Sequence, residues 1–224
     1  MSQDYKSVFD IIGPVMVGPS SSHTAGAARI GKVMRLIYGA EPTQVDVYFY
    51  ESFATTYKGH RTDYALVGGL LEMAPSDQRL SHSLEIAKEK GIKINFITKT
   101  EKAMHPNTVK AHLIKDDYEM EITGISIGGG AFQITEIDGF KIEFSLEMPT
   151  FLIRHKDVPG VIAEVTKLLS DNDINISTMT VNRQDKGCMA FMIIEVDSCS
   201  EPEIATQLRH LPNVINARFI ERRS

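Results

Sequence analysis

The chain has 224 residues, 42% of them apolar, and carries a formal net charge of −5 at pH 7. This length is enough for one large or two small globular domains with buried cores. The mild acidity gives no support to a surface for nucleic acid or anionic membranes, and no apolar run approaches the roughly 18 residues that a membrane span needs. We therefore expect neither nucleic acid nor a membrane as a partner. The N-terminus has no basic stretch followed by an apolar one, so we expect a cytoplasmic protein.

The chain contains only two cysteines, Cys188 and Cys199. Two thiolates cannot hold an iron–sulfur cluster, which normally needs three or four. Their spacing also excludes a CxxC redox pair. In a reducing compartment we expect two free and mostly buried thiols.

The first strongly periodic segment is a predicted helix over residues 24–38. Ile30, Met34 and Ile37 recur at helical spacing, which indicates one apolar face. Ser22 or Thr24 is a natural N-cap, because a short hydroxyl side chain can accept from the first free N–H groups of a helix.

Helices come early in the first half of the chain, and strands in an antiparallel arrangement come late. The segment 51–63 is polar and leads into a helix that Thr62 or Asp63 would cap. The predicted elements are a short helix or turn at 7–14, a strand at 45–50, helices at 64–73 and 81–90, and strands at 92–97, 108–114, 119–127, 131–137 and 140–146. The sequence therefore predicts an α+β fold, with a mixed α/β domain over residues 1–146.

The second half has a rhythm of its own after a plausible boundary at residues 147–149. The predicted elements are a strand at 150–154, a helix at 161–170, strands at 174–181 and 188–196, a helix at 201–211 and a strand at 214–220. The order βαββαβ predicts a ferredoxin-like domain over residues 149–224. One face or edge of such a sheet is free to pair with a second copy, so we expect a homodimer through this domain.

The stretch around His23 is the strongest candidate for chemistry. Small polar residues at 20–24 precede the predicted helix, whose first N–H groups and positive dipole end suit a carboxylate or phosphate. His23 would stand beside such an anion with a side chain that exchanges protons near neutral pH. The alternative is a long polar N-cap without further function.

Three other motifs could join this site. The segment Lys58–Asp63 offers a second anion contact near His23, a solvated loop, or, more weakly, a metal site from His60 and Asp63. The turn at residues 105–107 could fix an imidazole and an amide or simply lie exposed. Ser126–Gly130 is either an anion-binding nest or a wide bulge between strands. Together these motifs make a shared pocket the better prediction.

The predicted ferredoxin-like domain carries one candidate site of its own, in the loop at residues 155–160. Gly160 frees the N-terminus of the following helix for a carboxylate, and Asp157 can hold an ammonium group. Such a loop suits a zwitterionic amino acid. A capped loop between strand and helix is the alternative.

In this order, the motifs resemble the iron–sulfur-dependent L-serine dehydratases, or L-serine ammonia-lyases. The residues that carry the resemblance are Gly18–Thr24, Ser52–Thr55, Lys58–Asp63, His105–Thr108 and Ser126–Gly130. The segment that they span resembles the β part of that family, which is related to the allosteric substrate-binding domain of some phosphoglycerate dehydrogenases. Residues 149–224 resemble an ACT domain.

This resemblance implies the β subunit of a two-subunit enzyme that converts L-serine to pyruvate and ammonia. A separate, cysteine-rich α subunit would hold a [4Fe–4S] cluster, and this chain would hold no metal. The resemblance leaves open whether the enzyme also needs a monovalent cation. His23 matches the family's motif histidine and is the candidate catalytic residue. The implied substrate-binding residues are Ser21, Ser22, Thr24, Lys58, His60, Arg61, His105 and Asn107.

By resemblance to ACT domains of the phosphoglycerate dehydrogenase type, an amino-acid effector would bind the ACT domain at His155, Asp157, Gly160 and Asn175. Asp157 stands where that family often has Asn, and the alternative is a domain that serves only dimerisation. Two other functions remain open, a non-catalytic amino-acid sensor and a detached dehydrogenase domain. A dehydrogenase would need a dinucleotide motif, but Gly128–Gly130 does not open a helix in a βαβ unit.

Overall fold

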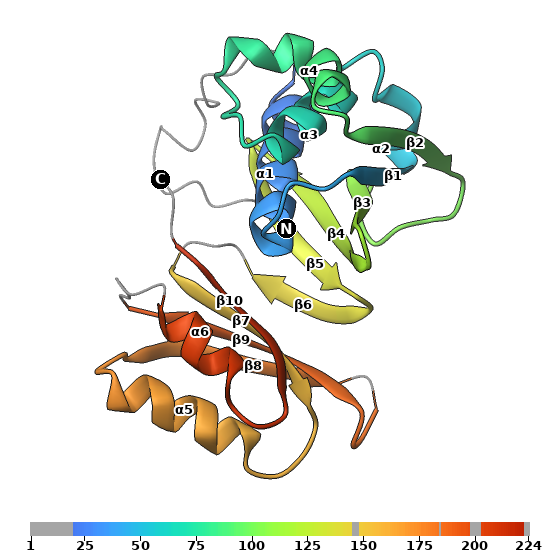
Figure 1. Cartoon of the computed structure of the whole chain (residues 1–224). Coiled ribbons are helices and arrows are strands. Elements are labelled where there is room, and N and C mark those ends of the chain that lie inside the picture. Colours follow the sequence, from blue (N-terminus) through green and yellow to red (C-terminus); the bar gives the residue numbers. More distant parts are fainter. Residues whose placement is uncertain (1–19, 145–147, 184, 198–202, 222–224) are drawn as a thin grey trace. The chain divides into compact units, whose positions relative to one another are not determined.

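The computed structural model describes residues 20–144, 148–183, 185–197 and 203–221 (Figure 1). The chain divides into two compact units, Met1–Asp138 and Gly139–Ser224. The short helix or turn predicted at 7–14 lies outside the described residues, as does part of the predicted boundary at 147–149, which stays a prediction. Among the described helices, none is both long enough and apolar enough to cross a membrane.

The first unit begins with a six-residue π-helical turn, η2 (Ser21–Gly26), which runs directly into α1 (Ala27–Tyr38). Ile30, Met34 and Ile37 are fully or almost fully buried, as their spacing predicts. The helix ends at Gly39, whose φ of 72° is the left-handed conformation that favours glycine at a helix end.

The helix cap differs from the prediction. Ser20 is the N-cap, and its Oγ accepts from the backbone N–H of His23 at 3.2 Å. The predicted caps Ser22 and Thr24 are therefore wrong. The wider π-turn starts the helical segment before Ser22, so both residues already lie inside it.

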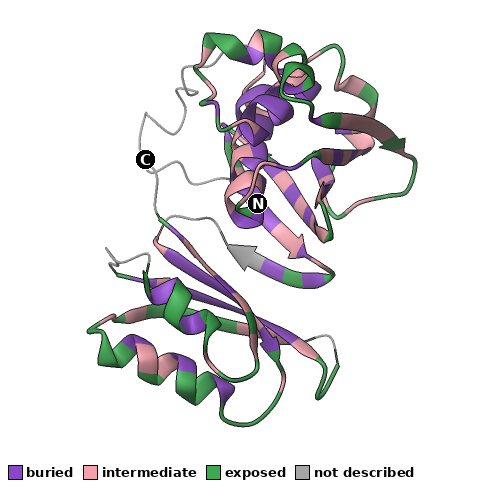
Figure 2. Cartoon of the chain, in the orientation of Figure 1, coloured by how far each residue is buried: buried purple, intermediate pink, exposed green. Residues whose placement is uncertain are grey.

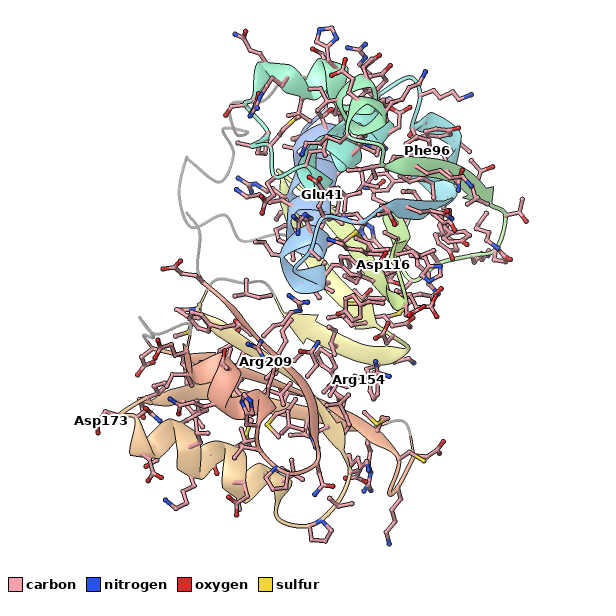
Figure 3. The ribbon with its side chains drawn as sticks, viewed as in Figure 1. Glu41, Phe96, Asp116, Arg154, Asp173 and Arg209 are labelled. Carbon is pink, nitrogen blue, oxygen red and sulfur yellow. The ribbon has the colours of Figure 1, made fainter. Side chains whose placement is uncertain are left out.

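The strands of this unit stand in the order β2-β1-β3-β4-β5. The pairing of β1 with β2 is parallel, and the β1–β3, β3–β4 and β4–β5 pairings are antiparallel. Their bounds are β1 (Gln44–Tyr50), β2 (Lys93–Lys99), β3 (Thr108–Lys115), β4 (Tyr118–Gly128) and β5 (Ala131–Ile137). Val45, Val47 and Phe49 of β1 are fully buried and alternate with partly exposed residues. Phe96 of β2, labelled in Figure 3, stacks on Phe49 with ring centroids 5.9 Å apart.

Three further helices and one short 3₁₀ segment complete the described part of this unit. Their bounds are α2 (Glu51–Thr56), α3 (Thr62–Leu70), the 3₁₀ segment η3 (Gln78–His82) and α4 (Ser83–Glu89). The sequence predicts a polar segment without a helix at 51–63, so helix α2 corrects that prediction. Six residues are too few to show helical periodicity, and the helix start depends on a distant carbonyl, that of Pro106, which accepts from the N–H of Ser52 at 3.0 Å.

The start of α3 also differs from the prediction. Its N-cap is Arg61, which has a left-handed φ of 56° and forms no side-chain cap hydrogen bond. Thr62 and Asp63 therefore lie within the first turn. Asp63 instead accepts from the N–H of Tyr64 at 2.9 Å.

Glycines bring α1 and α3 into close contact. A Cβ on Gly31 would lie 2.1 Å from the carbonyl oxygen of Leu66, and a Cβ on Gly69 would lie 2.0 Å from that of Ala28. Figure 2 shows buried residues along both helices. The two backbones therefore touch with no side chain between them, which fixes α1, and the π-turn before it, against α3.

The second unit has the predicted βαββαβ order, preceded by β6 (Phe140–Phe144). Its antiparallel sheet has the order β10-β7-β9-β8, and Figure 1 shows both helices on one face of it. The bounds are β7 (Thr150–Lys156), α5 (Val161–Asp171), β8 (Ile176–Arg183), β9 (Met189–Val196), α6 (Glu203–Arg209) and β10 (Val214–Ile220). Arg209, labelled in Figure 3, donates to the carbonyl of Ala217 at 2.9 Å and so ties α6 to β10.

Cys188 of this unit is a free and exposed thiol. The prediction of a mostly buried cysteine is wrong at this position, because Cys188 follows the turn residue Gly187 and precedes the first residue of β9. Cys199 lies outside the described residues.

Candidate active site

The imidazole of His23 is held between hydroxyl groups on both of its nitrogens. Nδ1 lies 3.0 Å from Oγ of Ser22 and 3.3 Å from Oγ of Ser20, both from the start of the first helical segment. Nε2 lies 3.2 Å from Oγ of Ser52, at the start of α2. A hydroxyl can donate or accept, so these contacts fix the position of the ring and allow either nitrogen to carry the proton.

Two other rings border His23 and decide its charge. The His60 ring lies 4.6 Å away between centroids at a tilt of 40°, and the Phe53 ring meets it edge-on at 5.2 Å. Burial, followed by the neighbouring His60, lowers the pKa of His23 below its ordinary value of 6.5. At neutral pH the imidazole is therefore uncharged and has a lone pair available to accept a proton.

The turn at residues 105–107 positions Ser52 and links α2 to β4. Its Pro106 carbonyl accepts from the backbone N–H of Ser52, and the Asn107 carbonyl accepts from the N–H of Ser126 at 3.0 Å. The His105 ring is held by this loop, since its Nδ1 accepts from the N–H of Asn107 at 3.1 Å. His105 and Asn107 therefore support the site from behind, and no hydrogen bond joins either side chain to His23 in the described part of the chain.

Ser126 fastens β4 to the π-turn. It is fully buried, and its Oγ donates to the carbonyl of Ser22 at 2.9 Å. A Cβ on Gly26 would lie 2.2 Å from that same Oγ, so only glycine leaves room for the serine. The contact therefore explains two small residues that lie 100 positions apart in the sequence.

The glycine run after Ser126 forms the end of the β4–β5 hairpin. The register shifts between Ser126 and Gly128, and residues 128–130 all have positive φ. Of the two interpretations of this motif, the bulge is therefore present in the structure. Arg29 of α1 donates to the carbonyl of Gly130 at 2.9 Å and closes the hairpin against the helix.

In the segment from Lys58 to Asp63, it is His60 that contacts His23. The carbonyl of His60 also accepts from Oγ1 of Thr24 at 3.4 Å. Lys58 and Arg61 are exposed, and their charged groups lie over the rings of Tyr57 at 5.8 Å and Tyr64 at 4.7 Å.

Beside His60 the chain buries several polar groups. Nδ1 of His60 and Oγ1 of Thr62 are buried without a hydrogen-bond partner among the described residues. Asp63 is 8% exposed, and burial raises the pKa of its carboxyl group. No group of three or more His, Cys, Asp or Glu side chains within the described ranges could hold a metal ion.

Three residues of this cluster were not among the predicted site residues, namely Ser20, Ser52 and Ser126. Ser52 belongs to a stretch that carried the family resemblance, which is the signal that could have identified it. Ser20 and Ser126 belong to two other such stretches, but their roles, at a helix cap and in a buried contact, depend on the folded chain.

The second unit does not gather its predicted effector residues in one place. His155 is 2% exposed, and its Nδ1 lies 2.8 Å from the carbonyl oxygen of Lys156. Asp157 accepts from the N–H of Gly187 at 3.0 Å and from the guanidinium of Arg183 at 3.2 Å. The Gly187 N–H is the main reason that the pKa of Asp157 is lowered.

Gly160 is the N-cap of α5, with a φ of 98°, and lies close to Asp157 in the sequence. Asn175 precedes β8, whereas Asp157 is bonded to Arg183 at the far end of that strand. Asn175 donates to Asp197 at 2.6 Å instead. Within one chain, Asn175 therefore lies about the length of β8 away from Asp157.

Residues 7–136 match the family model described as serine dehydratase beta chain. This chain belongs to that family. Residues 151–216 match the model of the AHAS small subunit-like ACT domain. The matches confirm the resemblance that the motifs indicated, and the βαββαβ unit agrees with the predicted ACT fold.

Relatives of similar length carry the same name. The chain is 50% identical to the probable L-serine dehydratase, beta chain, of Bacillus subtilis (strain 168), over 96% of this chain and 98% of that one. It is 38% identical to the L-serine dehydratase, beta chain, of Peptoniphilus asaccharolyticus, over 97% and 99% of the two chains. A D-3-phosphoglycerate dehydrogenase of B. subtilis is 30% identical over 81% of this chain but only 35% of its own length.

Proposed function

We propose that this chain is the β subunit of an L-serine dehydratase that, with a separate α subunit, deaminates L-serine to pyruvate and ammonia. The observation that carries this proposal is an uncharged imidazole, His23, held between hydroxyls in a chain that matches serine dehydratase beta chains over nearly its whole length. A sensor without chemistry would have no use for a base in this state.

The reaction is an elimination of water, and it needs a base. The Cα–H bond of L-serine breaks and the hydroxyl group leaves Cβ, which gives aminoacrylate and then pyruvate and ammonia. A neutral His23 can take the Cα proton on one ring nitrogen, because its lowered pKa keeps that nitrogen free at neutral pH.

The substrate carboxylate would lie near the start of the first helical segment. The hydroxyl of Ser21 forms no hydrogen bond within the described part of the chain, so it is available to a ligand. The hydroxyls of Ser22 and Thr24 are already bonded to His23 and to the His60 carbonyl, and they would have to exchange these partners to bind substrate. The other predicted substrate contacts stay proposals: Lys58, His60, Arg61, His105 and Asn107.

The residues of this chain do not fit as ligands of a [4Fe–4S] cluster. The whole sequence has two cysteines, and Cys188 lies exposed in the second unit. We therefore place the cluster on a cysteine-rich α subunit and assign no step on the metal to this chain. A requirement for a monovalent cation stays open. An exposed thiol at Cys188 suits a reducing compartment, which supports a cytoplasmic enzyme.

The proposal also includes a homodimer contact through the second unit. Strand β8 is at one edge of its sheet and pairs only with β9 among the described strands, and Met179 on it is 39% exposed. An edge strand of this kind can pair with a second copy.

Anaerobic purification of the chain together with the proteins that bind it tests the proposal. We expect a brown complex with a cysteine-rich partner that forms pyruvate from L-serine. A colourless dimer of this chain alone, without pyruvate formation under the same conditions, would overturn the proposal and favour an amino-acid sensor.

A further inference from the structure

An unbroken line of hydrogen bonds crosses His23 from one ring nitrogen to the other. Its members are Oγ of Ser52, Nε2 and Nδ1 of His23, Oγ of Ser22 and Oγ of Ser20. The successive distances are 3.2 Å, 3.0 Å and 3.3 Å. Hydroxyls and a neutral imidazole can each donate and accept, so protons can shift along the whole line.

The two ends of this line differ. Ser52 forms a single side-chain hydrogen bond in the described part of the chain, the one to His23, so its hydroxyl can turn toward an incoming ligand. On the other side of the ring are two hydroxyls. Ser22 is the nearer one, with Oγ 3.0 Å from Nδ1, and Oγ of the helix cap, Ser20, lies 3.3 Å from both Nδ1 and Oγ of Ser22. We therefore assign Nε2 as the nitrogen that meets the substrate and the hydroxyls on the Nδ1 side as the path that leads away from it.

A charged His23 is unfavourable in this environment. The ring is partly buried, Phe53 covers one edge, and the second imidazole, His60, is the titratable group that faces it. A base that took a proton and kept it would become an imidazolium beside His60. A path that removes one proton while another arrives avoids that charge.

We propose that Ser22 and Ser20 form an exit route for the proton that His23 takes from the substrate. This inference rests on the proposed function. The substrate C–H bond breaks and its proton binds Nε2, while the Nδ1–H bond breaks and that proton moves to Oγ of Ser22. The hydroxyl proton of Ser22 moves to Oγ of Ser20, and the hydroxyl proton of Ser20 passes to water.

Each hydroxyl then again holds one proton, and the ring is neutral with its proton on Nε2. The first tautomer is restored when the Nε2 proton passes to the departing hydroxide, which leaves as water, and a proton returns along the same route to Nδ1. Ser22 and Ser20 are positioning residues in this scheme, because they act on the substrate only through His23. Ser22 would therefore matter for proton transfer even where the carboxylate binds elsewhere.

The test uses the complex with its partner subunit and compares Ser22→Ala, Ser22→Thr and Ser21→Ala. Turnover is measured with α-deuterated L-serine and in mixtures of H₂O and D₂O. We expect a curved dependence on the D₂O fraction in the wild type, since several protons move together. Ser22→Ala should become linear with about 10- to 100-fold slower turnover, less than the loss of a whole general base.

The two other variants separate proton transfer from structure. Ser22→Thr keeps a hydroxyl and should restore the curvature, whereas Ser21→Ala should weaken substrate binding and keep the curvature. ¹⁵N NMR of histidine in the full chain alone gives a readout that needs no turnover. We expect Ser22→Ala to shift the neutral His23 toward the tautomer with its proton on Nε2.

The outcomes distinguish the exit route from the proposed function. A wild-type complex that turns over L-serine with a linear D₂O dependence overturns the route and leaves the function standing. So does a Ser22→Ala variant that keeps the curvature and the wild-type tautomer. A complex that forms no pyruvate from L-serine overturns the proposed function, and the route falls with it.

Discussion

The two units of the chain treat their predicted polar sites in opposite ways. In the first unit, side chains from η2, from α2 and from the segment Lys58–Asp63 meet around His23. In the second unit, Asp157 is bonded to Arg183 and Gly187 of the β8–β9 hairpin, and Asn175 lies at the other end of β8. Motifs far apart in sequence become a site only where long-range contacts hold them together.

The contacts that make this difference are specific. Ser126 reaches the carbonyl of Ser22 through the space left by Gly26, and the Pro106 carbonyl fixes Ser52. The loop that follows β7 also makes long-range contacts, but these come from Gly187 and Arg183 and already satisfy the carboxylate of Asp157. The first unit therefore holds its candidate site within one chain, whereas in the second unit Asn175 lies apart from Asp157.

The largest effect should come from His23→Gln, which removes the base but keeps a polar side chain. In the complex with the partner subunit we expect turnover to fall about 10²- to 10⁴-fold, the usual contribution of a general base. His112→Gln is the matched control, since that imidazole lies on β3 and contacts Glu119 at 3.1 Å. A His23→Gln enzyme within tenfold of the control would remove His23 from the chemistry.

Gly26→Ala attacks the contact that joins β4 to the π-turn. The added Cβ would lie 2.2 Å from Oγ of Ser126, so the serine must give up its bond to the Ser22 carbonyl. We expect a loss of about 1–3 kcal/mol in the free energy of unfolding, the usual cost of overpacking. Thermal unfolding measures it against Gly59→Ala, where the nearest atom lies 3.7 Å away. Equal melting temperatures of the two variants would contradict the prediction.

His60→Asn tests how the second imidazole sets the charge of His23. Burial is the larger cause of the lowered pKa of His23 and remains in the variant, so this pKa should rise only part of the way toward 6.5. Only the neutral imidazole can act as the base. An enzyme whose His23 has a higher pKa therefore loses activity at a higher pH when the solution is acidified. The acid limb of the pH profile of kcat/KM should therefore move upward. An unchanged limb, or one that moves downward, would show that His60 does not act on His23.

Asp63→Asn asks whether the buried carboxylate costs stability. Burial raises the pKa of Asp63 above 3.8. The charged carboxylate therefore lowers the free energy of unfolding at a pH above that raised pKa. This loss of stability disappears as the pH falls below 3.8. An amide oxygen can still accept from the N–H of Tyr64. We expect a higher melting temperature than the wild type at pH 7 and no difference near pH 3.5. A lower melting temperature at pH 7 would show that the fold needs the anion.

The smallest effect should come from the second unit. Asp157→Asn changes an exposed contact, so we expect turnover and melting temperature close to those of the wild type. For the full chain with millimolar L-serine, shown by sedimentation to be a monomer, calorimetry should give no heat that Asp157→Asn removes. A monomer that binds L-serine and loses the heat on Asp157→Asn would mean that one chain does hold an effector site.

Local sequence patterns account for most of the fold. The predicted strands between residues 108 and 137 lie within two residues of β3, β4 and β5, since alternating side chains and turn glycines mark them. The pattern failed at α2 and at the cap of the first helical segment. A six-residue helix shows no period, and the wide π-turn moves the cap to Ser20.

The site was predictable only in part, and for a related reason. His23 and His60 stand out because an imidazole in a polar motif is a recognisable chemical signal, and the structure places their rings in contact. Lys58 and Arg61 carry the same kind of signal, yet their charged groups lie over tyrosine rings. The place of Ser52 depends on a carbonyl more than 50 residues away, which no local pattern contains.

The π-turn at Ser21–Gly26 needs a fixed number of residues between the cap Ser20 and α1. Deletion of one residue there would let an ordinary α-helix run through, and the apolar face of α1 could stay in place. The wide turn sets the spacing of Ser20, Ser22 and His23, so the loss of one residue would change which of these side chains meet. The number of residues between the cap and α1 is therefore a feature by which related chains can be compared.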